Sequence, residues 1–261
     1  MKKFLCIALA VVLTLSMVAA FAACSKDKGG EETTAAATTS AKETLVMATN
    51  AEVPPYEFHE GDKIVGIDAE VAQAIADKLG MELKIEDVSF DSIIPGVQAG
   101  KYDMGMAGMT VTPEREKSVN FSTSYAKGVQ VIIVKEGSDI KSKDDLEGKK
   151  IGVQTSTTGD LYATDAYGEE NVVKYENGAI AVQALVSGKV DCVIIDNQPA
   201  KKYVEANEGL VILETPYEEE DYAICFNKEN TDLQQKVNKA LEELIADGSV
   251  QKIVDKYIKA D

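Results

Sequence analysis

Beyond its first 43 residues the chain alternates short strand patterns with helix patterns, and this alternation constrains the fold more than any other feature. Thr44–Thr49 reads as a strand, and Gly66–Leu79 as an amphipathic helix that ends at Gly80, a residue typical of helix C-caps. Later, Val190–Ile195 is apolar enough for a buried strand, and Pro199–Ala206 has a helical pattern. Strands that alternate with helices predict an α/β protein with mostly parallel sheets, covered by helices on both faces.

The alternating pattern starts again after about residue 126, where Val129–Lys135 reads as a new strand. A chain of 261 residues is long enough for two modest domains. The repeat of the pattern therefore predicts two α/β lobes. Ligands bind at the carboxyl ends of strands in sheets of this kind, so we expect a binding cleft where the lobes face each other.

One segment has the residues of an anion site. Tyr102–Ala107 reads as a short strand, and Gly108 permits a close approach of its backbone to another group. Thr112 is suited to cap a helix, and Pro113 is a favoured first helical residue. Arg115 follows within the first turn, so amides, a hydroxyl and a guanidinium can converge on a carboxylate. The alternative is an ordinary capped helix with a surface arginine.

The N-terminus has the features of a secretory signal. Lys2 and Lys3 precede an apolar run from Phe4 to Ala23, which predicts a signal peptide over residues 1–23. The run is also long enough for a retained membrane anchor. Cys24 directly after two alanines is typical of a lipoprotein cleavage site, with this cysteine as the lipidated first residue carrying the palmitate. Ordinary cleavage after Ala22 is the competing interpretation.

Residues 24–43 are small, polar and low in complexity, and such a segment cannot bury a core. We expect a flexible tether between the lipidated cysteine and the folded body. A tether of this length after a lipid anchor indicates a secreted protein on the outer face of a cytoplasmic membrane, in a Gram-positive bacterium.

Charge and residue usage exclude several functions. The formal net charge of −17 argues against a nucleic-acid partner. Cys192 and Cys225 each lie in an apolar run, which favours buried free thiols over a disulfide. With His59 as the only histidine, neither a metal site nor histidine catalysis is expected. Gly152–Gly159 lacks the lysine of a phosphate-binding loop, and no cofactor is predicted.

The run from Ala107 to Arg115 resembles the carboxylate-binding segment of family 3 solute-binding proteins, the amino-acid-binding proteins of ABC importers. The resemblance covers about Thr44 to Asp261. Further matching segments follow in order: Pro54–Phe58, Val65–Asp68, Phe90–Pro95, Phe121–Ser122 and Asp191–Asp196.

The resemblance implies a two-lobed, type II periplasmic-binding-protein fold. The chain would cross between lobes near residues 125–130 and 218–222, and these two segments would form the hinge. Lobe 1 would then contain residues 44–125 and 222–261, and lobe 2 residues 126–221.

The resemblance also implies a site for a free amino acid, whose two charges both need partners when buried. Arg115 would hold the carboxylate through a bidentate pair, with a hydroxyl and an amide from Thr110 and the amide of Thr158. Asp196 and the carbonyl of Gly108 would hold the ammonium group. Asp196 can also be read as a helix N-cap.

Fewer residues indicate which side chain is bound. By resemblance Phe90 is an aromatic wall, although it can equally be a core residue. Gln154 matches a position that reaches the ligand side chain, and Asn50, Glu52 and Val53 match the loop that meets it. If Glu52 faces the ligand, it favours arginine or lysine over glutamine or cystine; otherwise it is a solvated loop charge.

The sequence thus predicts a substrate-binding subunit that performs no reaction and delivers an amino acid to a separate permease and ATPase. We expect a monomer that contacts the membrane only through its lipid. An enzyme of the cyclohexadienyl or prephenate dehydratase kind, which shares this fold, is the alternative, with Glu52 as a conceivable acid or base.

Overall fold

The computed structural model describes residues 42–213 and 216–258. The predicted signal peptide, Cys24 and nearly all of the predicted tether lie outside the described residues.

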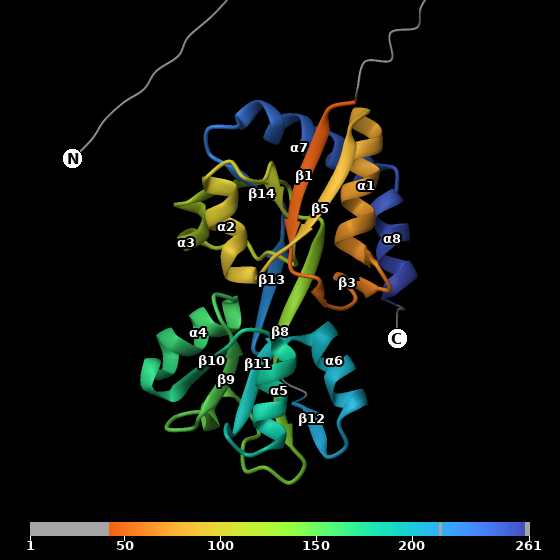
Figure 1. The fold of residues 1–261 in the computed structure, drawn as a ribbon. Helices are drawn as coiled ribbons and strands as arrows, with labels where there is room; N and C mark the ends of the chain where they lie inside the picture. The colour runs from red at the N-terminus through yellow and green to blue at the C-terminus, as the bar shows by residue number, and fades with distance from the viewer. Residues whose placement is uncertain (1–41, 214–215, 259–261) are drawn as a thin grey trace, which may run out of the picture. The chain divides into compact units, whose positions relative to one another are not determined.

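Two central sheets organise the described chain (Figure 1). The first has the strand order β5-β1-β6-β14-β7. Its strands are β1 (Thr44–Thr49), β5 (Glu82–Asp87), β6 (Met104–Gly105), β7 (Val119–Phe121) and β14 (Cys225–Asn227). We call this sheet and the elements packed on it lobe 1.

The second sheet has the order β10-β9-β11-β8-β12, and β13 pairs with β8. Its strands are β8 (Ala126–Lys135), β9 (Ile151–Gln154), β10 (Val172–Tyr175), β11 (Cys192–Asp196), β12 (Leu210–Ile212) and β13 (Glu218–Tyr222). We call this sheet and its helices lobe 2.

Helices cover both sheets. Those of lobe 1 are α1 (Ile67–Leu79), α2 (Phe90–Gln98), α3 (Pro113–Glu116), α7 (Thr231–Ala246) and α8 (Ser249–Tyr257). Those of lobe 2 are α4 (Thr158–Tyr167), α5 (Gly178–Val186), α6 (Asn197–Ala206) and the 3-10 helices η1 (Lys143–Asp145) and η2 (Glu169–Asn171). Among the described helices, none is long and apolar enough to cross a membrane.

The α/β class is confirmed, but the sheets are mixed rather than mostly parallel. β1 runs parallel to β5 and β6, and β9 runs parallel to β10 and β11, whereas β14 and β8 pair only antiparallel with their neighbours. β8 carries the chain out of lobe 1 and β13 brings it back. These two strands therefore run side by side in opposite directions.

A third sheet, in the order β2-β3-β4, was not predicted from the sequence. Its strands are β2 (Glu52–Val53), β3 (Glu57–Glu60) and β4 (Lys63–Val65). They are short, and their sequence has no extended apolar alternation.

The packing of β11 explains why Cys192–Ile195 is apolar. Cys192 and Ile194 pack into one core cluster with α4, while Val193 packs into another with α5 and α6. A strand covered on both faces reads as a continuous apolar run. Cys192 and Cys225 are both buried and unbonded, as predicted.

The two crossing strands are hydrogen-bonded to each other, with Tyr222 opposite Ala126 and Glu218 opposite Gln130. Thr110 of lobe 1 forms an isolated bridge with Tyr222. The middle of the Ala107–Arg115 segment is thereby tied to the ribbon that connects the lobes.

Candidate ligand-binding site

A cavity between the two lobes gathers most of the residues predicted to bind a ligand. From lobe 1 it is lined by Phe90, Gly108, Thr110 and Arg115, and from lobe 2 by Gln154, Thr158 and Asp196. The carboxyl ends of β6 and β11 bring these residues together, as expected for α/β sheets.

Arg115 is held by α3 and by carbonyl groups of both lobes. The hydroxyl of Thr112 accepts a hydrogen bond from the backbone N–H of Arg115 at 3.1 Å, the N-cap that the sequence predicted. The guanidinium donates to the carbonyl of Thr110 at 2.8 Å and to that of Ser156 at 3.0 Å. It lies over the ring of Phe90, 5.4 Å from its centre. A guanidinium has five N–H donors, so further donors remain for a ligand.

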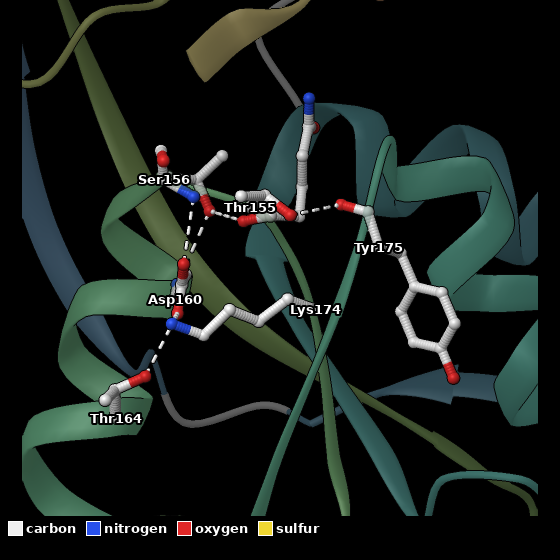
Figure 2. A network of polar contacts seen from close by, with 8 residues as sticks. Thr155, Ser156, Asp160, Thr164, Lys174 and Tyr175 are labelled. Atoms are coloured by element: carbon white, nitrogen blue, oxygen red, sulfur yellow. Dashed lines mark hydrogen bonds and ion pairs between the residues drawn. The ribbon is translucent and has the colours of Figure 1, made fainter. Parts of the chain in front are cut away.

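The loop before α4 is fixed by a polar network (Figure 2). Ser156 has a left-handed backbone with φ of 65°. Its N–H donates to buried Asp160 at 2.9 Å, and Asp160 is ion-paired with Lys174 at 3.0 Å. This network presents the carbonyl of Ser156 to Arg115 and sets the start of α4, where Thr158 lines the cavity.

Asp196 both caps a helix and lines the cavity. It accepts hydrogen bonds from the backbone N–H of Gln198 at 3.0 Å and of Val129 at 3.2 Å, and from the hydroxyl of Tyr222. A Cβ on Gly128 would lie 2.1 Å from that hydroxyl, so glycine is needed there. Burial raises the pKa of Asp196 to about 6, although its hydrogen bonds oppose the shift. A cationic group would relieve this cost.

Two predicted residues lie outside this cavity. Asn50 accepts a hydrogen bond from Gln154 at 3.0 Å, which joins the lobes directly. Asn50 and Glu52 line a second cavity, together with Asp87, Val88, Ser89 and Glu176.

Tyr56, close in sequence to the loop predicted to meet the ligand side chain, also lines the cavity. Three further lining residues were not predicted from the sequence: Gln130, Tyr203 and Tyr222. Tyr56 lies in the matching segment Pro54–Phe58, and Tyr222 lies in the predicted second crossing between the lobes. Their positions in the sequence could therefore have indicated that they line the cavity. Tyr203 lies within α6, where a tyrosine reads as an ordinary surface residue.

A buried carboxyl pair supports the wall at Gly108. Glu57 and Asp68 are both fully buried. Asp68 accepts hydrogen bonds from the N–H of Gly108 at 2.8 Å and the hydroxyl of Tyr125 at 2.9 Å. With both groups ionised, the oxygens of Glu57 would have no donor among the described residues. Burial and the charge of Asp68 raise the pKa of Glu57 well above its usual value, which favours the protonated form of Glu57, and a protonated Glu57 can donate to Asp68.

The Glu57→Gln variant is expected to fold, and its free energy of unfolding is expected to depend less on pH than that of wild type. The raised pKa of Glu57 means that its stabilisation is complete below about pH 4.5 and is lost as pH rises toward the folded-state pKa. The slope reaches about 1.4 kcal/mol per pH unit for one group. Urea unfolding at several pH values should show a flatter profile for Glu57→Gln than for wild type. The exposed control Glu60→Gln should keep the wild-type slope, and an equal slope in both variants would contradict the shared proton.

No group of three or more metal-ligating side chains is arranged to hold a metal ion in residues 42–213 and 216–258. The charges of the cavity are instead arranged in two opposed positions, Arg115 on one lobe and Asp196 on the other.

Residues 45–260 match the bacterial extracellular solute-binding proteins, family 3. The arginine-binding extracellular protein ArtP of Bacillus subtilis is 35% identical, over the whole length of both chains. Among solved structures, the arginine-, lysine-, histidine-binding protein ArtJ of Geobacillus stearothermophilus is 35% identical with a TM-score of 0.79, covering 84% of this chain and 96% of its own. An ancestral arginine-binding protein bound to arginine is 42% identical with a TM-score of 0.78, covering 84% of this chain and all of its own.

These relatives are solute-binding proteins rather than enzymes, so the dehydratase alternative is set aside. The family match, the similarity to solved structures and the opposed charges of the cavity all indicate an amino-acid-binding protein. The chain belongs to family 3 of the bacterial extracellular solute-binding proteins, as a substrate-binding protein of an amino-acid ABC transporter.

Proposed function

We propose that this protein captures a cationic L-amino acid, arginine or lysine in preference to glutamine or cystine, in the cavity between its lobes. The observation that carries the proposal is the opposition of buried Arg115 and buried Asp196 across one cavity. A zwitterion satisfies both charges at once, whereas a simple carboxylate or amine satisfies one.

At the carboxylate end, Arg115 binds through the donors that Thr110 and Ser156 do not use. The amide of Thr158, at the start of α4, adds a second contact.

At the ammonium end, Asp196 and the carbonyl of Gly108 accept hydrogen bonds. Thr110 belongs to this end as well, because its hydroxyl donates its proton to Glu220 at 3.1 Å. The hydroxyl oxygen is then left to accept from the ligand. This changes the expectation that the Thr110 hydroxyl donates to the carboxylate.

The preference for a cation rests on the acidic second cavity. Glu52, Asp87 and Glu176 line it together with Asn50, which is hydrogen-bonded to Gln154 of the first cavity. Burial, and then the charge of Glu52, raise the pKa of Tyr203 to about 12, and Tyr203 lines the first cavity. The arginine-binding protein ArtP and the ancestral arginine-binding protein bound to arginine support the same preference.

Capture would close lobe 1, taken as residues 44–125 and 222–261, onto lobe 2, taken as residues 126–221. A ligand that contacts both lobes favours the closed state by its differential affinity. Direct contacts between the lobes, from Arg115 to Ser156 and from Gln154 to Asn50, add to the closed state.

We further propose that Cys24 is lipidated, and that residues 24–43 tether a monomer to the outer face of a Gram-positive cytoplasmic membrane. The cysteine after a signal-like segment and the low-complexity run support this proposal. From there the protein would present its amino acid to the permease, and the separate ATPase would drive import.

A thermal-shift screen of the twenty amino acids with ornithine and cystine tests the function, since a ligand stabilises the state it binds. Arginine or lysine should give the largest rise in melting temperature. A protein that no amino acid stabilises would contradict amino-acid capture.

Glu52→Gln is expected to weaken arginine binding up to about fivefold and glutamine binding little, because a partly solvated charge contributes up to about 1 kcal/mol. Calorimetric titration of both ligands measures this. Glu60→Gln, an exposed change of equal charge, should affect neither ligand. Equal losses for arginine and glutamine in Glu52→Gln would overturn the role of Glu52.

A further inference from the structure

Glu220 is a buried carboxylate on the second crossing strand, β13. Its neighbours Glu218 and Glu219 are exposed, as an acidic run in a sequence predicts. Glu220 itself is only 5% exposed. An ionisable side chain is rarely buried without a specific set of partners, so its contacts are informative.

One carboxylate oxygen of Glu220 receives two hydrogen bonds. The hydroxyl of Thr110 donates to it at 3.1 Å and the side-chain amide of Gln130 at 2.9 Å. Thr110 belongs to lobe 1, and Gln130 lies on β8, directly opposite Asp196 in the sheet. Thr110 and Gln130 both line the cavity. Glu220 thus ties the two faces of the cavity together at the hinge.

Glu220 also acts on Arg115 without a hydrogen bond to it. The guanidinium donates to carbonyl oxygens of Thr110 and Ser156. Burial lowers the pKa of Arg115, and the negative charge of Glu220 is the largest effect opposing that shift. A counter-ion at this position lowers the cost of burying the Arg115 charge and leaves the remaining N–H groups of Arg115 for a ligand.

We propose that Glu220 is a positioning residue of the ligand site, which turns the Thr110 hydroxyl into an acceptor for the ligand ammonium and balances the charge of Arg115. The inference rests on the proposed function, because it assigns the ammonium end of the same cavity. An ionised carboxylate can only accept, so the hydroxyl proton of Thr110 must point toward Glu220. A neutral amide at position 220 removes this constraint, since it can donate as well.

The test compares two ligands on Glu220→Gln. Arginine carries the α-ammonium group, and 5-guanidinopentanoate is the same molecule without it. The affinity for arginine should fall about tenfold, the scale of a hydrogen bond to a charged group. The affinity for 5-guanidinopentanoate should not fall, because the variant removes a negative charge near its carboxylate. Titration calorimetry, with competition for weak ligands, measures both.

The controls separate positioning from a general loss of structure. Glu219→Gln, an exposed change of equal charge on the same strand, should leave both affinities unchanged. If Glu220→Gln does not fold by circular dichroism, Thr110→Val removes the same hydroxyl while keeping its shape. Like Glu220→Gln, Thr110→Val should lower the affinity for arginine relative to the affinity for 5-guanidinopentanoate. In the double variant, the two effects should be less than additive.

The outcomes are distinct. A folded Glu220→Gln with an unchanged ratio, or with equal losses for the two ligands, overturns the role of Glu220 and leaves the proposed function standing. A wild-type protein that binds no amino acid overturns the proposed function, and the inference about Glu220 with it.

Discussion

Arg115→Ala is expected to weaken arginine binding by about 30-fold to 4,000-fold, while the protein remains folded. Removing one partner of a buried, hydrogen-bonded charge pair costs about 2–5 kcal/mol of binding free energy, and each 1.4 kcal/mol is tenfold. The fold should persist because the cap of α3 uses the backbone N–H of Arg115, which alanine retains. Calorimetric titration and circular dichroism measure the two effects.

Arg115→Lys separates charge from geometry. Lysine keeps the positive charge but lacks the planar fork that binds a carboxylate through two parallel hydrogen bonds. The affinity of Arg115→Lys for arginine should therefore lie between that of wild type and that of Arg115→Ala. Lys117→Ala, at an exposed position just after α3, is the matched control and should bind normally. Unchanged affinity in Arg115→Ala would remove this residue from the carboxylate site.

Asp196→Asn is expected to reduce the binding free energy of arginine by a similar amount, about 2–5 kcal/mol, and that of 5-guanidinopentanoate only little. Asparagine can still cap α6 and accept hydrogen bonds, so the change removes mainly the charge that faces the ammonium group. Calorimetric titration of the two ligands checks the difference. Equal losses would show that Asp196 supports the fold of the cavity and does not bind the ammonium group.

The unliganded Asp196→Asn protein should be at least as stable as wild type at neutral pH. Burial raises the pKa of Asp196 to about 6 from an ordinary value near 3.8, so the ionised group costs stability as pH rises between these values. Thermal unfolding at pH 5 and pH 8 measures this cost. Asp191→Asn, at an exposed position just before β11, is the control of equal charge.

The parts of the site that were predictable follow local rules. Thr112, Pro113 and Arg115 form the capped helix start that their order indicates. Asp196 ends an apolar strand and begins a helix, and the sequence showed both features. Local capping chemistry and strand burial act over a few residues, so a single sequence contains them.

The missed parts depend on contacts between distant residues. Glu220 stands in a run of four acidic residues, which reads as solvated. Its contacts with Thr110 and Gln130, 110 and 90 positions away, explain its burial. Asn50 and Gln154 are 104 positions apart and are hydrogen-bonded to each other. Gln154 lines the ligand cavity, whereas Asn50 lines the second cavity. The mixed sheets likewise follow from the path of β8 and β13 between lobes, which periodicity does not encode.

The tyrosines of the cavity also give this protein a spectroscopic signal that is sensitive to the ligand. The chain has no tryptophan, so its ten tyrosines dominate its near-ultraviolet spectrum. Tyr56 and Tyr222 meet edge to face with ring centres 5.3 Å apart, and the hydroxyl of Tyr222 donates to Asp196. A cation that arrives at Asp196 changes the electric field on this ring pair. The protein thus has an intrinsic chromophore beside Asp196 in the ligand cavity, and ligand binding can be followed without an attached label.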